Sequence, residues 1–212
     1  MAEPTTTAPG PAHLRRSPLH HLHDRIRAAS TPAVRLAELP FLTMTALRVD
    51  PAGPAADRVG KVLGAALPTR CGDTARAGAR TALWLGPDEW LVVSGDDEPG
   101  ALTDELRRAL TGDHGAAGSV VDVSANRTTL ALSGPFARHV LEKGCPLDLH
   151  PRSFAPGSAL VTQVGPVPVV LWQTGEEPAA PAYRLLPRAS FADHLTRWLI
   201  DAMAEYAHPE VP

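Results

Sequence analysis

The pattern of apolar and polar residues repeats once along this chain. In the first half, an alternating apolar run that ends near Val49 is followed by a Gly-Pro pair, a helical pattern, two short apolar runs and an amphipathic helical pattern. The same order returns in the second half, starting with the apolar run 130–132 and a second Gly-Pro pair at 134–135. A period of two is typical of strands and a spacing of three and four is typical of helices. The pattern therefore predicts two similar βαββα units.

Proline, glycine and turn residues set the expected boundaries of the first unit. Ser17-Pro18 resembles a helix start and predicts a short helix within 17–29 that docks on a larger body. The sequence Gly-Pro-Asp-Glu at 86–89 separates two β-prone runs and predicts an antiparallel hairpin. We expect strands at 34–36 and 41–49, a helix between Pro54 and Pro68, hairpin strands at 81–85 and 90–94, and a helix that ends near Leu110.

The second unit follows a linker of small residues at 113–118. We expect a strand at 119–123 that crosses from one half to the other, a helix between Pro135 and Gly144, strands at 160–164, 167–172 and 183–186, and a final helix with the stripe Phe191, Leu195, Trp198, Leu199 and Ala202. Ser190 and Asp193 have the spacing of a capping box at the start of that helix. Adjacent hairpins, rather than strict alternation of strands and helices, favour an α+β fold with antiparallel sheets.

The expected domain organisation has three parts. Residues 1–16 are small, polar and proline-bearing, which predicts a flexible N-terminal tail. Residues 17–112 form the first βα half and 119–206 the second, and the two halves form one compact body. A chain of 212 residues is long enough for such a body, because it buries roughly 70% of the surface that its unfolded form exposes.

Charge and cysteine content narrow the classes of partner and compartment. The formal net charge of -3 gives no field that attracts nucleic acid or an anionic membrane. The two cysteines, Cys71 and Cys145, allow at most one disulfide, and a core of this size does not require one. No apolar run reaches the roughly 18 residues of a membrane span, and no secretory pattern opens the chain. The expected location is the cytoplasm.

Candidate metal-binding and nucleophilic residues each have an ordinary structural interpretation. His20, His21 and His23 cluster near the N-terminus, but no third carboxylate or cysteine ligand accompanies them, which favours a solvated or packing role over a metal site. Cys145 follows Lys143, which favours a reactive thiolate, and it also follows a helix C-terminus, which opposes one. The nucleophile-elbow, dinucleotide and phosphate-loop motifs are absent. The sequence therefore nominates no catalytic, cofactor-binding or metal-binding residue.

Aromatic and arginine side chains leave two alternatives open. Trp84, Trp90, Trp172 and Trp198 could line a pocket for a planar ligand, but their places in the repeat favour core packing. Arg127, Arg138, Arg152, Arg184 and Arg188 could bind a carboxylate-bearing ligand or a partner subunit, or serve solubility. The sequence does not rank these roles.

Several motifs resemble the gamma subunits of heterotetrameric sarcosine oxidases. They are Trp84-Leu85-Gly86-Pro87-Asp88-Glu89-Trp90-Leu91, Asp122-Val123-Ser124-Ala125-Asn126-Arg127-Thr128, Leu132-Ser133-Gly134-Pro135, Lys143-Gly144-Cys145-Pro146-Leu147-Asp148-Leu149-His150-Pro151, Tyr183-Arg184-Leu185-Leu186 and Ser190-Phe191-Ala192-Asp193-His194-Leu195 with Trp198-Leu199. Each motif is weakly specific alone, but their order and spacing cover the chain from about Ser17 to Tyr206.

The resemblance implies a small subunit with a fold related to the folate-binding domain of glycine-cleavage T-proteins. In that family the chain assembles with alpha, beta and delta subunits into a complex that oxidatively demethylates sarcosine to glycine. The products are formaldehyde or methylene-tetrahydrofolate and hydrogen peroxide. The resemblance places FAD, FMN, NAD and tetrahydrofolate on other subunits, with no cofactor and no catalytic residue on this chain. A permanent interface is expected, and Leu19, Leu22 and Ile26 are candidates for it.

An alternative function is a free-standing tetrahydrofolate-binding protein or aminomethyltransferase of the T-protein superfamily. Lys143-Gly144-Cys145 resembles the start of a signature in a folate-dependent iron-sulfur-assembly branch. The residues Pro146-Leu147-Asp148 depart from the continuation of that signature, and the extra C-terminal domain of the transferases is missing. Tight tetrahydrofolate binding by the isolated chain would favour this alternative.

Overall fold

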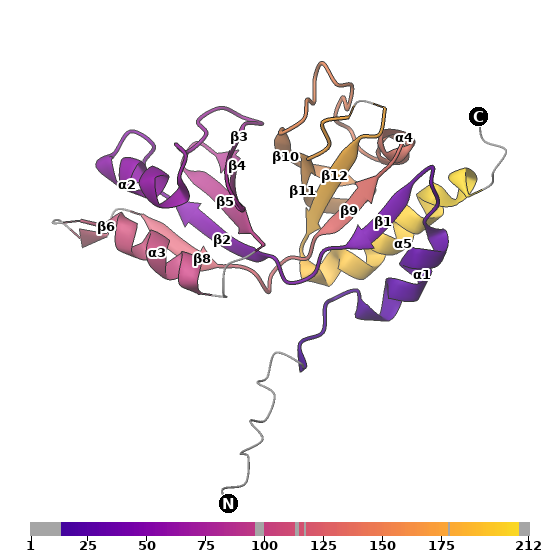
Figure 1. Cartoon of the computed structure of the whole chain (residues 1–212), viewed down its shortest axis with the longest axis horizontal. Coiled ribbons are helices and arrows are strands. Elements are labelled where there is room, and N and C mark those ends of the chain that lie inside the picture. The colour runs from indigo at the N-terminus through magenta and orange to yellow at the C-terminus, as the bar shows by residue number, and fades with distance from the viewer. Residues whose placement is uncertain (1–13, 96–99, 113–114, 117, 178, 208–212) are drawn as a thin grey trace, which may run out of the picture.

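The computed structural model describes residues 14–95, 100–112, 115–116, 118–177 and 179–207. Two five-stranded antiparallel sheets form the framework, and Figure 1 shows them side by side, spread apart at one end and joined at the other. This α+β architecture agrees with the fold class expected from the sequence. The predicted flexible tail lies outside the described residues except for 14–16.

The first sheet has the strand order β3-β4-β5-β2-β8. Its strands are β2 (Thr43–Arg48), β3 (Thr74–Ala77), β4 (Arg80–Gly86), β5 (Glu89–Ser94) and β8 (Ser119–Asp122). The hairpin of β4 and β5 confirms the turn predicted at 86–89. A separate two-stranded ribbon is formed by β6 (Thr111–Gly112) and β7 (Gly115–Ala116).

The second sheet has the strand order β1-β9-β12-β11-β10. Its strands are β1 (Arg35–Glu38), β9 (Leu130–Ser133), β10 (Ala159–Val164), β11 (Val167–Gln173) and β12 (Ala182–Pro187). The two orders are equivalent when β8 is matched with β1, since β2 then corresponds to β9 and β3 to β10. The sequence repeat is therefore also a structural repeat.

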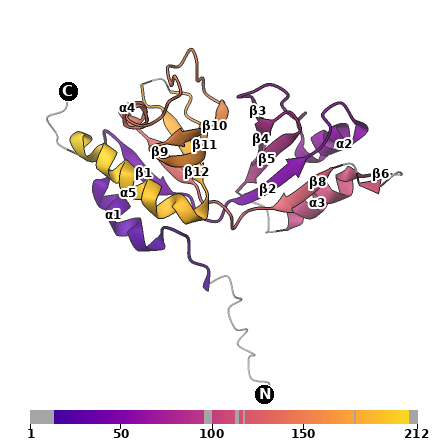
Figure 2. The same ribbon diagram turned by 180° about the vertical axis from the view of Figure 1, so that it is seen from behind.

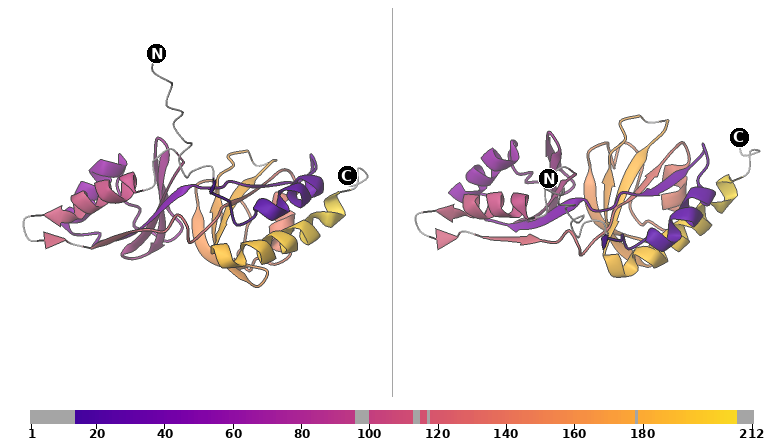
Figure 3. Two further views of the ribbon diagram at one scale, coloured as in Figure 1. Left: turned by 90° about the horizontal axis from the view of Figure 1, so that it is seen from below. Right: turned by 60° about the horizontal axis from the view of Figure 1, so that its bottom comes forward.

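Helices cover the outer face of each sheet, as the views in Figures 2 and 3 show. The first sheet carries α2 (Pro54–Leu63) and α3 (Ala101–Leu110). The second carries α1 (His23–Ala29), α4 (Ala137–Glu142) and α5 (Ala192–Met203), with 3-10 turns at His20–Leu22, Ala189–Phe191 and Ala204–Tyr206. Within the described residues, no helix has the length and apolar content needed to cross a membrane.

Three apolar clusters divide the core into layers. One lies between the first sheet and its helices, a second between the second sheet and its helices, and a third between the two sheets. Along β5, Trp90 and Val92 face the helices while Leu91 and Val93 face the other sheet. Because both faces of these strands are covered, their sequences are continuous apolar runs rather than alternating ones.

The two sheets exchange their edge strands. β1 directly precedes β2 along the chain, yet β1 pairs with β9 of the second sheet. β8 precedes β9, yet it pairs with β2 of the first sheet. The predicted strand at 119–123 therefore does cross between the halves, and β1 crosses in the opposite direction, as the two connections at the bottom of Figure 1 show. The sheets consequently do not coincide with the predicted ranges 17–112 and 119–206.

Two glycines accompany the exchanged strands. Gly118 (φ 141°) lies against the carbonyl oxygen of Arg48, at 2.1 Å from where a Cβ would be placed. Gly134 (φ 120°) lies against Ala33 in the same way, since a Cβ placed on it would lie 2.7 Å from the carbonyl oxygen of Ala33. Only glycine has both the backbone freedom and the small size for these approaches.

Two sequence expectations about individual elements need correction. Leu19, Leu22 and Ile26 are not surface residues available to a partner, because all three are buried against the second sheet.

The second correction concerns the start of helix α5, which has no side-chain cap. The carboxylate of Asp193 instead contacts His21 and Arg197, so the predicted capping box is not formed.

Candidate functional site

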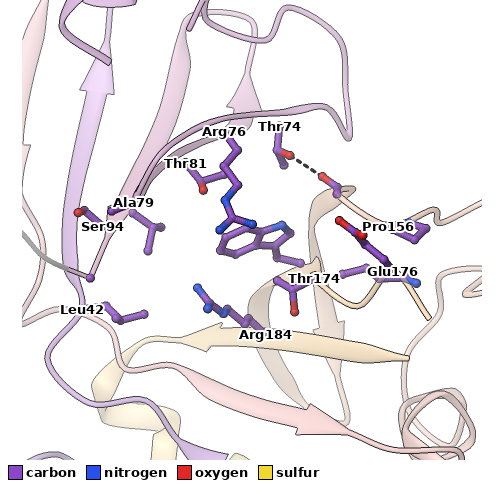
Figure 4. Close-up of a pocket in the computed structure, with 15 residues that line it drawn as sticks. Leu42, Thr74, Arg76, Ala79, Thr81, Ser94, Pro156, Thr174, Glu176 and Arg184 are labelled. Atoms are coloured by element: carbon purple, nitrogen blue, oxygen red, sulfur yellow. Dashed lines mark hydrogen bonds between the residues drawn. The ribbon is translucent and has the colours of Figure 1, made fainter. Parts of the chain in front are cut away.

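A cavity of about 570 Å³ lies between the two sheets. Figure 4 shows that its walls come from both halves of the chain. The first sheet contributes residues of β3, β4 and β5, and the second contributes residues of β11 and β12 and the segment before β10. The volume lies within the range of small-molecule sites.

Two arginines approach the cavity from opposite walls. Arg184 lies on β12 of the second sheet and Arg76 on β3 of the first, and Figure 4 shows both side chains extending toward the space between them. The guanidinium of Arg184 lies 4.9 Å from the centre of the Trp172 ring, a cation–π contact. Burial lowers the pKa of Arg184, and the charge of Arg76 lowers it further. The described carboxylates form no ion pair with either arginine.

Polar groups complete the lining. Gln173 also borders the cavity, but it lies opposite Tyr183 in the register and on the same face of β11 as Leu171, so its side chain is directed toward the helices and not into the cavity. Glu176 is exposed and contributes a carboxylate to the wall. The hydroxyls of Thr74 and Thr81 also line the space, but none of the described lining residues is a histidine or a cysteine. The lining thus combines two guanidinium groups, a carboxylate and hydroxyls, which suits the binding of a polar molecule.

Direct hydrogen bonds join the sheets beside this cavity. The hydroxyl of Thr74 donates to the carbonyl oxygen of Gly157 at 2.6 Å, the bond drawn in Figure 4. The amide of Ala159 donates to the carbonyl oxygen of Gly72 at 3.0 Å. These bonds fix the distance between the walls, so the cavity is preformed.

The histidine cluster near the N-terminus makes separate contacts with carboxylates. His21 Nε2 lies 2.5 Å from Asp193, and His23 Nε2 lies 2.8 Å from Glu38. Hydrogen bonds from Arg197 and His21 lower the pKa of Asp193 to about 2. His20 stacks edge-on against His23. No group of three metal-ligating side chains occurs in the described part of the chain.

The side chain of Glu38 is a buried carboxylate, 1% exposed. One of its oxygens contacts Ser17 at 2.5 Å and His23, and the other accepts a hydrogen bond from Thr128 at 2.7 Å. Two of these partners, Ser17 and His23, lie in the N-terminal segment, and Thr128 lies just before β9. The cluster therefore has an evident structural role in holding the N-terminal segment to the second sheet.

The cysteines and tryptophans largely have packing environments. Cys145 is buried in the apolar cluster between the second sheet and its helices, whereas Cys71 is exposed, and both are free thiols. Trp90 is fully buried, and its indole N–H donates to Pro68. Trp172 is the exception, because it belongs to the cluster between the sheets and also lines the cavity.

The arginines left unranked by the sequence have different environments. Arg138 pairs with Glu142, and Arg152 is exposed. Arg127 donates to the carbonyl oxygen of Leu186 at 2.7 Å, and burial together with the charge of Arg188 lowers its pKa. Arg184 alone of the five lines the cavity between the sheets.

Sequence reasoning missed Arg76 and Glu176. Arg76 lies in a loop-like polar stretch, and Glu176 in the segment between two strands, so neither interrupts an apolar pattern. Their convergence depends on how the two sheets face each other, which no local pattern encodes.

Comparisons with known proteins place this chain among relatives of similar length. A model of the sarcosine oxidase, gamma subunit family matches residues 48–205. Sarcosine oxidase subunit gamma from Arthrobacter sp is 44% identical over 200 residues, which cover 93% of this chain and 94% of the relative. The subunit gamma from Corynebacterium sp. (strain U-96) is 44% identical over 202 residues, with the same shares covered.

Solved structures show the same relationship. A chain of the heterotetrameric sarcosine oxidase from Corynebacterium sp. U-96, in complex with pyrrole 2-carboxylate, has 43% identity and a TM-score of 0.84, covering 94% of this chain and 100% of that one. The glycine cleavage system aminomethyltransferase T from Bartonella henselae shares the fold at 15% identity and a TM-score of 0.67, covering 88% of this chain and 57% of that one. Both the family model and the relatives thus show that this chain belongs to the sarcosine oxidase gamma subunit family.

Proposed function

We propose that this chain is the non-catalytic gamma subunit of a heterotetrameric sarcosine oxidase in the cytoplasm. The observation that carries the proposal is the 44% identity to sarcosine oxidase gamma subunits over 93% of the chain. The proposed partners are the alpha, beta and delta subunits of the complex, which oxidises sarcosine to glycine. FAD, FMN, NAD and tetrahydrofolate would bind to those other subunits.

The architecture supports a scaffold role. Exchanged strands and an apolar layer connect the two sheets, which suits a subunit that holds larger chains in a fixed arrangement. The described lining of the cavity includes no histidine or cysteine that could act as a base or nucleophile. The likeness to the aminomethyltransferase concerns the fold alone and gives no support for transferase activity.

Co-expression tests the proposed assembly. The chain would be produced with the alpha, beta and delta subunits from the same source and analysed by size-exclusion chromatography. We expect one complex containing all four chains, with sarcosine-dependent oxygen consumption. A chain that elutes alone as a monomer in the presence of the other three would refute the proposal.

Substitutions within the assembled complex test the non-catalytic role. Cys71→Ser removes an exposed thiol, and His150→Asn removes an exposed imidazole. We expect kcat and KM for sarcosine within about twofold of the parent complex, because surface substitutions away from a reacting centre have small effects. A loss of kcat by orders of magnitude, with assembly intact, would show that this chain contributes to the chemistry.

A further inference from the structure

The cavity between the sheets has an arrangement of charge that the scaffold role does not require. Arg184 is only partly exposed, and its guanidinium packs on Trp172 instead of on a carboxylate. Arg76, which is exposed, approaches from the other sheet, so two positive charges border one cavity. Bringing like charges together in a partly desolvated site is unfavourable unless a negative group lies between them.

The aromatic wall beside the arginines is a second feature of the site. Trp172 belongs to the apolar cluster between the sheets and also lines the cavity, and the guanidinium of Arg184 lies 4.9 Å from the centre of its ring. The cavity therefore combines positive charge with an aromatic surface, which suits a ligand with an anionic group and an apolar body.

The walls of the cavity are held in place before any ligand arrives. The hydrogen bond from Thr74 to Gly157 and the bond from Ala159 to Gly72 both connect one sheet to the other. A preformed site loses little conformational entropy on binding. The cavity of about 570 Å³ accommodates a small molecule with a body larger than the anionic group itself.

From these observations we infer that the cavity binds a small organic anion, whose carboxylate or phosphate group lies between Arg76 and Arg184 and whose body packs beside Trp172. Guanidinium groups match both kinds of oxyanion, since their N–H donors fit paired oxygen atoms. Glu176 opposes this binding, because its carboxylate lines the same cavity. Removal of its charge should therefore strengthen binding.

Calorimetric titration of the full-length chain tests the inference with three probes of similar shape. Benzoate carries a carboxylate, phenyl phosphate carries a phosphate, and benzamide is a neutral analogue. We expect one equivalent of benzoate or phenyl phosphate to bind, with benzamide at least about tenfold weaker because it lacks a charge-assisted hydrogen bond. The tighter of the two anions identifies the preferred oxyanion. Absence of binding by both anions, or equal binding of benzamide, would overturn the inference.

Four substitutions locate the binding. Arg184→Met and Arg76→Gln should each weaken anion binding by about tenfold or more, whereas Glu176→Gln should strengthen it about twofold to fourfold. Arg152→Gln is the matched control, because it removes one exposed arginine outside the cavity and should leave affinity unchanged. If Arg184→Met does not fold, as judged by circular dichroism, the anion affinity of Arg76→Gln decides the outcome, because Arg76 is exposed and its substitution should not disturb folding. Unchanged affinity in Arg76→Gln and in a folded Arg184→Met would place the anion elsewhere and refute this site.

Discussion

Gly144 and Gly165 lie against the indole of Trp198 on helix α5. A Cβ placed on Gly144 would lie 2.6 Å from Cζ2 of Trp198 and 2.9 Å from the amide nitrogen of Gly165. Gly165 has φ 55°, and a Cβ placed on it would lie 3.1 Å from the same ring. The backbone at both positions therefore serves as a flat surface on which the indole packs, and an additional methyl group has no space there.

We predict that Gly144→Ala destabilises the protein. Overfilling a packed site costs about 1–3 kcal/mol in the free energy of unfolding, and urea denaturation measures it. Gly95→Ala is the control, because its Cβ would make only an ordinary contact at 3.8 Å with Leu42. Gly144→Ala combined with Trp198→Leu should lose less than the sum of the single variants, since the smaller side chain relieves the clash. Simple additivity would contradict this explanation.

Both tyrosines should titrate well above the ordinary range. The sequence contains only Tyr183 and Tyr206, and burial is the leading cause that raises the pKa of each to about 12. We predict that phenolate absorbance of the folded protein rises near pH 12, whereas the unfolded protein in urea titrates near pH 10, roughly the unperturbed value. A native titration midpoint near pH 10 for either tyrosine would contradict the burial found here.

The same pKa shifts determine how the free energy of unfolding depends on pH. A folded pKa above the unfolded one means that the native state binds more protons between about pH 10 and pH 12. Stability from this source is complete below about pH 10 and declines as the pH rises toward 12. Tyr183→Phe removes one of the two groups, so its free energy of unfolding should fall less steeply over this interval than that of the parent.

At the scale of single residues, the sequence predicts burial better than it predicts binding. The apolar runs correctly indicated that Trp90 is in the core, because its burial follows from the strand that carries it. They did not distinguish Arg184 from the other arginines. The role of Arg184 depends on Arg76, which lies on a different sheet, and a linear pattern holds no information on that approach.

Among the elements, β1 is held by contacts at its end and along its free edge. Glu38, its last residue, accepts hydrogen bonds from Ser17 and Thr128 and contacts His23 of α1. On the free edge of β1, the hydroxyl of Ser30 accepts a bond from the amide of Leu36 and donates to the carbonyl oxygen of the same residue. An edge strand presents unpaired backbone groups, and a side chain that occupies them prevents wrong pairing.

We predict that Glu38→Gln loosens this attachment. The amide keeps the size of the side chain but replaces one acceptor oxygen with a donor, which leaves Ser17, His23 or Thr128 without its partner. The expected loss is about 1–3 kcal/mol in the free energy of unfolding, measured by urea denaturation. Hydrogen exchange should also become faster in α1 and β1.

Glu177→Gln is the matched control for this change. Glu177 is exposed, so the same substitution there should shift stability by less than about 0.5 kcal/mol. A Glu38→Gln variant as stable as this control would show that the buried cluster contributes little to the attachment of β1.

The elements themselves were largely predictable, but their partners were not. The positions of α2, α3 and the β4–β5 hairpin follow from proline boundaries and local periodicity. The pairing of β1 with β9 could not be found in this way, because the alternation of apolar residues determines which face of a strand is buried and not which strand lies beside it. The predicted capping box of α5 failed because Asp193 contacts Arg197 one turn later in the helix and His21 from a distant segment.

Across the whole molecule, strand exchange makes the halves depend on each other unequally. The first sheet receives only β8 from the later part of the chain. The second sheet receives β1 and α1, together with the buried residues Leu19, Leu22, Ile26, Val34 and Leu36. Separate fragments 1–114 and 115–212 should therefore associate when mixed. The second fragment alone should lack cooperative unfolding, because removal of this apolar surface exposes its core to water.

A rearranged chain tests whether the exchange is the cause of this dependence. Glu38 pairs with Leu130 in antiparallel register, and the amide of Leu39 donates to Thr129 at 2.8 Å. The end of β1 therefore lies beside the start of β9. A direct fusion of residues 14–40 to residues 125–212 would join the two strands as a hairpin and supply every strand and helix of the second sheet. We predict that this fusion is a monomer with cooperative thermal unfolding, unlike the fragment 115–212. If the fusion stays unfolded, the contacts between the sheets, and not the missing strand, limit the stability of the second half.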